Sequence, residues 1–193
     1  MQADEFLRAA REFFRNQQYA VVIESETAWI LEEHLVAEGW TLDEEEIAMI
    51  LTAASPEIPS PPDGLAVLQV TSDESYEDYM TVVPGNREWV PTLDAATDPG
   101  VALFVGYVEG QPVATARLVC YGSVAEITGV QTLESHRRRG FGRALTLAAM
   151  SEARRRGCAA ITLTATEMGY PLYLSMGFEE VCSYRTYEPP PTG

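Results

Sequence analysis

Apolar and polar residues recur along this 193-residue chain with the spacings of short helices and strands. Residues 3–16 place apolar side chains at helical spacing, which predicts an amphipathic helix. An apolar, β-branched strand is predicted at 19–23, and a helix at 26–38 that ends at a glycine. Residues 47–51 read either as a strand or as part of a helix that begins in the acidic run 43–46. The pattern leaves both possibilities open.

Residues 55–64 contain four prolines, too many for a regular element, so we predict a linker there. It would separate a helix-rich segment, 1–54, from a domain at 65–193. In that domain the first predicted elements are strand 65–70 and a helix that Ser72 or Asp73 can cap and that runs to about residue 82. The later ones are, in order, short helix 92–97, strands 101–109, 111–120 and 123–132, helix 141–156, strand 159–164, short helix 170–176 and strand 178–187. Helices and strands in this mixture indicate the α/β class.

Charge and composition exclude several classes of protein. There are 29 acidic residues against 13 basic ones, a net charge of −16, and every basic residue is arginine. Such a chain should repel nucleic acid and anionic membranes and favour cationic partners, although net charge speaks first to solubility. The polar, acidic N-terminus is unlike a signal peptide, and no apolar run approaches the ~20 residues of a membrane span. We therefore expect a cytoplasmic protein without membrane or nucleic-acid partners.

Cysteine and histidine give no sign of a metal site. The chain has three cysteines, Cys120, Cys158 and Cys182, and two histidines, His34 and His136. Their spacing matches no metal-ligand pattern. We expect neither a structural nor a catalytic metal.

The most informative stretch is residues 132–143, in which three arginines and two glycines lie between a predicted strand and a predicted helix. A helix N-terminus carries partial positive charge and unpaired N–H donors, so it can bind an anion. Gly140 and Gly142 would let a phosphate approach those donors closely. Arginines add cationic groups that suit phosphate oxygens. This pattern predicts that the chain binds a phosphorylated ligand.

Two motifs together resemble the GNAT superfamily of N-acetyltransferases. Arg137, Gly140 and Gly142 match its acetyl-CoA-binding signature, arginine or glutamine followed by two residues, glycine, one residue and glycine. Some thirty residues later, Tyr173, Gly177 and Phe178 match the short helix and Gly-Phe turn that close the same fold. The resemblance implies a mixed, mostly antiparallel central sheet flanked by helices. It also implies that 1–54 is either a truncated, GNAT-like first half or an unrelated helical cap.

The resemblance further implies an acetyl-CoA cosubstrate and assigns its binding site. The pyrophosphate would be held by backbone N–H groups from Arg138 to Ala144, and the pantetheine arm by the backbone of the preceding strand. Thr166 stands where many relatives have asparagine, so it keeps a hydroxyl donor and lacks the amide. The candidate cosubstrate-binding residues are Val130, Thr132, Arg137, Arg138, Arg139, Gly140, Gly142, Arg143, Ala144 and Thr166.

The same resemblance suggests two catalytic residues. Tyr173 would protonate the leaving thiolate, or else would be a packing residue of a short helix. Glu126 would remove the amine proton through water, or else would be a surface carboxylate. Because Glu126 lies four residues before Val130, the two side chains should project from the same face of an extended strand. An apolar floor around Glu126 would suit it as a base.

The acceptor is less clear than the donor. Acidic and aromatic residues that could bind a cation are Asp73, Glu74, Tyr76, Glu77, Asp78, Tyr79 and Trp89, although the same spacing fits a solvated amphipathic helix. We expect a small-molecule amine or a peptide N-terminus as acceptor, and a homodimer is possible. Alternatives are a non-catalytic acyl-CoA-binding module, and nucleic-acid binding through 137–143 that would weaken steeply with salt.

Overall fold

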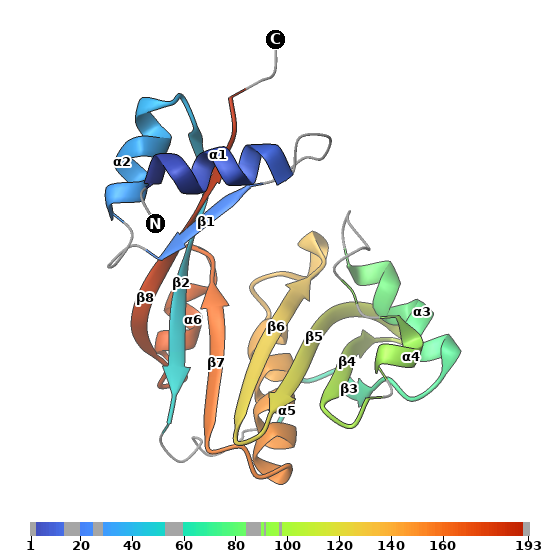
Figure 1. Ribbon diagram of the computed structural model, residues 1–193. Coiled ribbons are helices and arrows are strands. Elements are labelled where there is room, and N and C mark those ends of the chain that lie inside the picture. Colours follow the sequence, from blue (N-terminus) through green and yellow to red (C-terminus); the bar gives the residue numbers. More distant parts are fainter. Residues whose placement is uncertain are drawn as a thin grey trace. The chain divides into compact units, whose positions relative to one another are not determined.

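The structure is a computed structural model and describes residues 3–13, 20–24, 29–52, 60–83, 90, 92–96 and 98–190 (Figure 1). Its helices are α1 (Ala3–Phe13), α2 (Trp29–Ala37), α3 (Asp73–Val82), α4 (Leu93–Ala96), the 3-10 turn η2 (Glu134–His136), α5 (Phe141–Arg155) and α6 (Tyr170–Leu174). Its strands are β1 (Val21–Glu24), β2 (Thr41–Leu51), β3 (Leu65–Gln69), β4 (Val101–Val108), β5 (Gln111–Tyr121), β6 (Val124–Thr132), β7 (Ala160–Ala165) and β8 (Glu179–Glu188). Each predicted element overlaps an observed one, and β2 begins at Thr41, well before the predicted element at 47–51.

The strands form an eight-stranded sheet in the order β1-β8-β2-β7-β6-β5-β4-β3. The pairs β1–β8, β3–β4, β4–β5 and β5–β6 are antiparallel, whereas β6 and β7 are parallel. The predicted mixed, mostly antiparallel sheet flanked by helices is therefore confirmed. A parallel neighbour is what requires the long crossover through α5 between β6 and β7.

The chain divides into two compact units that do not follow the order of the sequence. The first unit contains residues 1–49, 164–175 and 179–193, and the second contains 50–163 and 176–178. The C-terminal strand β8 thus groups with the N-terminal residues. The predicted domains 1–54 and 65–193 stay predictions, and of the predicted linker the structure describes residues 60–64.

The core of the first unit is a small apolar cluster. Its buried members are Leu7, Val21, Ile23, Leu35, Trp40 and Tyr187. These side chains come from α1, β1, α2, β8 and the turn before β2, so residues far apart in sequence share one core. Tyr187 also donates a hydrogen bond from its hydroxyl to Glu32 Oε1 on α2, at 2.5 Å.

Acidic residues 43–46 belong to a strand, so the alternative in which they begin a helix is wrong. Arg185 of β8 donates from Nε to Glu45 Oε1 at 3.0 Å and from Nη1 to Glu32 Oε1 at 3.0 Å. Ser183 also donates to Glu45, at 3.1 Å. The hydrogen bond that Glu45 accepts from Arg185, and to a lesser extent the one from Ser183, lowers the pKa of Glu45. An acidic strand is tolerated here because its neighbour β8 supplies the arginine.

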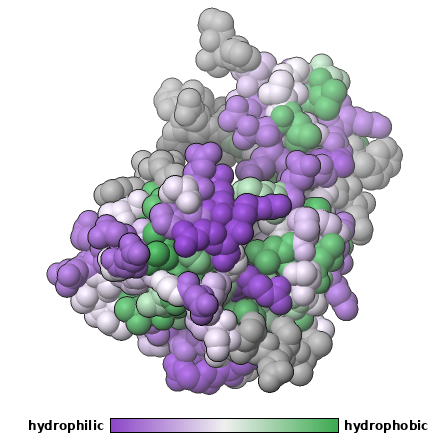
Figure 2. All heavy atoms as spheres, turned by 180° about the vertical axis from the view of Figure 1, so that it is seen from behind, coloured by the Kyte–Doolittle hydropathy of each residue, from purple (hydrophilic) through white to green (hydrophobic). Residues whose placement is uncertain are grey.

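In the second unit, α3 and α5 pack on opposite faces of the strands. Leu103 of β4 lies in a buried cluster with Tyr79 of α3. Gly106 faces the other way, where an added Cβ would lie 3.0 Å from Leu145 Cδ2 of α5. Successive strand residues point to opposite faces, so odd positions in this part of β4 face α3 and even ones face α5. Figure 2, seen from behind, shows hydrophilic and hydrophobic residues side by side on the face turned away from the view of Figure 1.

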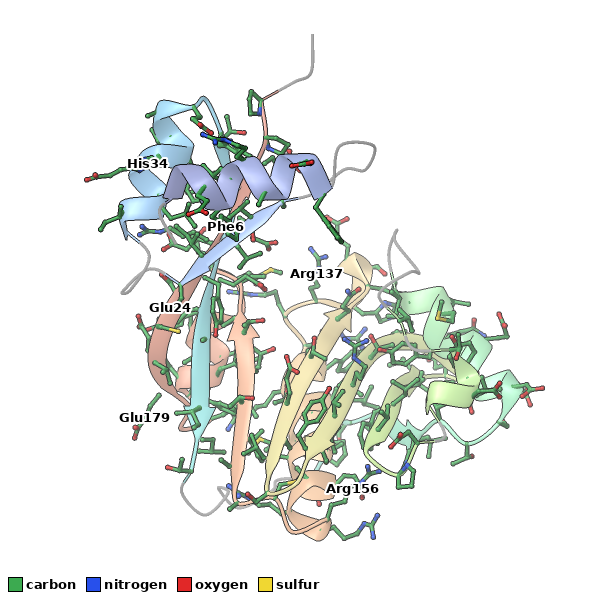
Figure 3. All side chains as sticks on the ribbon, viewed as in Figure 1. Phe6, Glu24, His34, Arg137, Arg156 and Glu179 are labelled. Atoms are coloured by element: carbon green, nitrogen blue, oxygen red, sulfur yellow. The ribbon has the colours of Figure 1, made fainter. Side chains whose placement is uncertain are left out.

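Glu152 anchors the C-terminal end of α5. Its Oε1 accepts hydrogen bonds from Arg155 Nη2 at 2.6 Å and from Arg156 Nε at 2.7 Å. Arg156 also donates to the carbonyl oxygens of Pro99, at 2.5 Å, and Val101, at 3.2 Å (Figure 3). The hydrogen bonds from Arg155 and Arg156 lower the pKa of Glu152 to about 2, although burial opposes the shift. Glu152 thereby connects the helix to the start of β4.

Replacing Glu152 by glutamine should lower the free energy of unfolding by about 1 kcal/mol near neutral pH. The folded pKa of about 2 lies below the ordinary value of 4.5, so the carboxylate stabilises the fold above that value. Its contribution is lost as the pH falls toward 2. Urea unfolding of both proteins at several pH values measures this difference, which should shrink in acid. A difference that is constant with pH would contradict the assignment.

Candidate functional site

The start of α5 forms an open backbone cradle. The helix begins at Phe141, as predicted, and its N-cap residue Gly140 has φ +82° with no side chain capping the helix. Arg138 also has a left-handed backbone, with φ +61°. Left-handed residues at a helix start turn successive N–H groups toward one concave space, which suits an anion. The geometry therefore fits the phosphate-binding role predicted for this turn.

Exposed arginines surround this cradle. Arg137 donates from Nε to the carbonyl oxygen of Thr132 at 3.2 Å, which holds its side chain at the end of β6 (Figure 3). The guanidinium of Arg139 lies 5.0 Å from the centre of the Phe141 ring. Residues 137–139 are exposed, whereas Arg143, on the first turn of α5, is half-buried. The cradle is thus electropositive from both its backbone and its side chains.

Strand β6 leads into the cradle and has a partly open edge. Its pairing with β7 covers three residue pairs, Val124–Ala160, Ala125–Ile161 and Glu126–Thr162. Beyond these, no pair joins the described residues of β6 and β7, while pairing with β5 on the other side continues to Thr132. Among the described residues, the backbone groups of 127–132 on the β7 side are therefore not paired with β7. Val130 and Thr132, predicted to bind the pantetheine arm, lie in this stretch.

A β-bulge interrupts β6 within the open edge. Arg117 of β5 pairs with Thr128, but Thr115, two residues away, pairs with Gln131, so β6 contains one extra residue. Gly129 has φ +60°, and its carbonyl oxygen accepts a hydrogen bond from Thr115 Oγ1 at 3.2 Å. Bulges often lie next to active sites because they redirect backbone and side-chain groups. The sequence analysis missed this feature, although an isolated glycine within a strand is its usual signal.

The bulge changes the expected place of Glu126. One extra residue between Glu126 and Val130 reverses the alternation, so the two side chains do not share a face, and that prediction is wrong. Glu126 is also exposed rather than set in an apolar floor. It pairs with Val119 and, by alternation, lies on the α3 face of the strands with Arg117. Its role as base stays a prediction.

Tyr173 and Thr166 belong to the first unit, whereas the other candidate site residues belong to the second. Tyr173 lies on α6, with 7% of its surface exposed. Gly169 makes room for its ring, because a Cβ there would lie 3.0 Å from Tyr173 Cε2. The carbonyl oxygen of Thr166 accepts hydrogen bonds from the N–H groups of Gly169 and Tyr170, both at 2.9 Å. Thr166 thus shapes the start of α6, and the chemical roles of both residues stay predictions.

Three of the candidate acceptor-binding residues of α3 make contacts within the protein. Tyr76 and Tyr79 lie in the apolar cluster beneath the helix. Asp78 accepts a hydrogen bond from the Tyr107 hydroxyl at 2.9 Å. These contacts favour the amphipathic-helix interpretation over a cation site. Trp89 lies outside the described residues.

The second unit has two surface hollows, one beside the cradle and one away from it. One of about 190 Å³ lies beside Gly140 and is lined mainly by apolar groups, among them Pro61, Pro62 and Leu147. The other, of about 440 Å³, includes Asp98 and Arg156 and lies at the C-terminal end of α5. The cradle is at the opposite end of that helix, so the larger hollow is a different place from the candidate site.

Within the described residues, no three histidine, cysteine or acidic side chains are grouped as metal ligands would be. None of the described helices combines the length and apolarity needed to cross a membrane. The three cysteines are present as free thiols.

Comparison with known proteins identifies the family. Residues 65–178 match the model of the acetyltransferase (GNAT) family. The structure resembles a GCN5-related N-acetyltransferase from Kribbella flavida, with a TM-score of 0.76 and 23% identity over 96% of this chain and 74% of that one. It also resembles a GCN5-related N-acetyltransferase from Sphaerobacter thermophilus, with a TM-score of 0.71 and 18% identity over 95% of this chain and 64% of that one.

A third similar structure is a tandem GNAT protein from the clavulanic acid biosynthesis pathway. Its TM-score is 0.72, with 14% identity over 98% of this chain and 70% of that one. At such identities these likenesses concern the fold, and they extend over the N-terminal residues as well as the matched segment 65–178. The chain belongs to the GNAT acetyltransferase family.

Proposed function

We propose that this chain is an N-acetyltransferase that moves an acetyl group from acetyl-CoA to an amine by direct transfer in a ternary complex. The observation that carries the proposal is the uncapped start of α5, with left-handed Arg138 and Gly140, next to the open edge of β6. The cradle fits a pyrophosphate, because its N–H groups converge and no side chain caps the helix. The strand edge fits the amide-containing pantetheine arm, because amides pair with exposed strand backbone.

The proposed reaction needs three protein groups. The amine nitrogen attacks the thioester carbon, and its proton passes through water to Glu126. A backbone N–H at the bulge around Gly129 stabilises the negative charge that develops on the carbonyl oxygen. The carbon–sulfur bond then breaks, and Tyr173 gives a proton to the departing thiolate. The products are the acetylated amine and free CoA.

We further propose that the acceptor is a small amine or a peptide N-terminus. The net charge of −16 supports an acceptor that is positively charged overall, since an acidic protein attracts cations from solution. The same charge opposes nucleic acid as a partner. Nothing in this proposal depends on whether the protein acts as a monomer or a homodimer.

The direct test is thiol release from acetyl-CoA by the purified protein across a panel of small amines and short peptides. Turnover that requires one class of amine would support the transferase and name its acceptor. Acetyl-CoA that raises the melting temperature without turnover would favour the non-catalytic acyl-CoA-binding alternative. Absence of any acetyl-CoA binding would overturn both.

Replacing Glu126 by glutamine tests the proposed base. If the carboxylate accepts the amine proton, kcat/KM should fall about 100-fold near neutral pH, because general-base catalysis typically contributes this much. The deficit should shrink at alkaline pH, where more of the amine is already neutral. The pH dependence of kcat/KM for the variant and the wild type measures both effects. If the variant had the same pH dependence of kcat/KM as the wild type, solvent rather than Glu126 would be the base.

A further inference from the structure

Tyr79 is a buried phenol whose hydroxyl reaches the bulge of β6. The side chain comes from α3 and only 2% of its surface is exposed. A Cβ added to Gly129 would lie 3.4 Å from the Tyr79 hydroxyl oxygen. The hydroxyl therefore points across the α3 face of the strands at the residue where β6 is interrupted.

This hydroxyl makes no hydrogen bond to any described residue. The Gly129 carbonyl oxygen accepts from Thr115 instead. Burial raises the pKa of Tyr79 to about 12, and the positive charge of Arg117 opposes the shift. The phenol thus stays protonated in the physiological range and keeps a donor with no protein acceptor among the described residues. A hydroxyl in this state can donate to water or to a bound ligand.

We propose that the Tyr79 hydroxyl donates a hydrogen bond to the acyl oxygen during transfer, as a second donor beside the backbone of the Gly129 bulge. The phenol reaches Gly129 from α3, and Gly129 belongs to the bulge of β6. The positive charge of Arg117 acts on the Tyr79 hydroxyl, so it would also favour negative charge on an acyl oxygen beside that hydroxyl. This inference rests on the proposed acetyltransferase function.

Residue 129 is a glycine for a reason of backbone conformation, and its small size also leaves room beside the phenol. Its φ of +60° lies in the left-handed region that favours glycine. A larger residue would also place its Cβ against the phenolic oxygen and narrow the space between phenol and bulge. The sequence pattern suggests Tyr79 as an aromatic surface for a cation, but its ring is buried in the structure.

The experiment compares Tyr79→Phe with Tyr107→Phe. Tyr107 is a matched control, because its hydroxyl donates to Asp78, the neighbour of Tyr79, and its removal leaves the bulge unchanged. We expect Tyr79→Phe to lower kcat about 100-fold, as loss of an oxyanion donor does, with KM for acetyl-CoA and the melting temperature unchanged. Tyr107→Phe should lower the melting temperature and leave kcat within about twofold of wild type.

The outcomes separate this inference from the proposed function. If the wild type turns over an amine and Tyr79→Phe does so with unchanged kcat, the inference is wrong and the transferase assignment stands. If Tyr79→Phe loses thermal stability in proportion to its activity, the hydroxyl has a structural role and the inference is again overturned. A wild type that binds acetyl-CoA and acetylates no acceptor overturns both.

Discussion

Replacing Gly142 by glutamate should weaken acetyl-CoA binding about 100-fold while leaving the protein as stable as before or more so. Gly142 is the second residue of α5, in the turn proposed to hold the pyrophosphate. A carboxylate there would meet the phosphates as a like charge. Two unit charges ~6 Å apart at an effective dielectric constant of ~20 interact by roughly 3 kcal/mol, which corresponds to about 100-fold in affinity.

The two effects of this substitution have opposite signs. An acidic residue in the first turn favours the helix dipole, and replacing a helical glycine removes a conformational cost, together about 1 kcal/mol in favour of the fold. Titration with acetyl-CoA gives the dissociation constant, and thermal unfolding gives the stability. Gly142→Ala is the control, because it shares the helical gain and lacks the charge. Equal affinity of both variants would exclude a phosphate at this turn.

Gly140 is a poorer position for such a test. Its φ of +82° strains any other residue by about 1–2 kcal/mol. A Cβ there would also lie 3.4 Å from Pro62 Cγ, on the side of the hollow rather than of the cradle. A loss of binding on substitution at 140 would therefore mix distortion of the turn with repulsion of the ligand. Gly142 separates the two.

Local signals in the sequence were enough to predict most elements. Ser72 caps α3, with its hydroxyl bound to the Ser75 N–H at 3.3 Å. Glu109 and Gly110, with φ values of +51° and +78°, make the hairpin turn between β4 and β5. Gly140 and Phe141 mark the start of α5 as expected. Each of these features depends on residues within one turn of the chain, so each could be recognised without knowing the fold.

Other features depend on partners far along the chain. The acidic run in β2 forms a strand because Arg185, 140 residues later than Glu45, neutralises it. The register shift in β6 is defined only by its pairing with β5. The position of Tyr79 over Gly129 needs both that shift and the packing of α3. The sequence could therefore suggest which residues bind acetyl-CoA, but it could not show which face of β6 each one occupies.

Replacing Tyr173 by phenylalanine should lower kcat about 100-fold without changing the affinity for acetyl-CoA, if the phenol protonates the leaving thiolate. The ring would still pack against Gly169, so the fold should persist with at most about 1 kcal/mol lost for the missing hydroxyl. Steady-state kinetics with a saturating amine measure kcat, and acetyl-CoA titration measures affinity. A variant with unchanged kcat would reduce Tyr173 to a packing residue of α6.

Tyr170→Phe is the matched control on the same helix. The Tyr170 hydroxyl donates a hydrogen bond to Glu180 Oε2 at 3.0 Å. The substitution therefore removes a phenolic hydroxyl from α6 and leaves Tyr173 in place. A second readout is the pH dependence. A thiol with a pKa near ~8.5 needs no acid when the pH is well above that value, so the deficit of Tyr173→Phe should shrink in alkaline solution. A packing defect would persist at every pH, because it does not depend on the protonation of the leaving group.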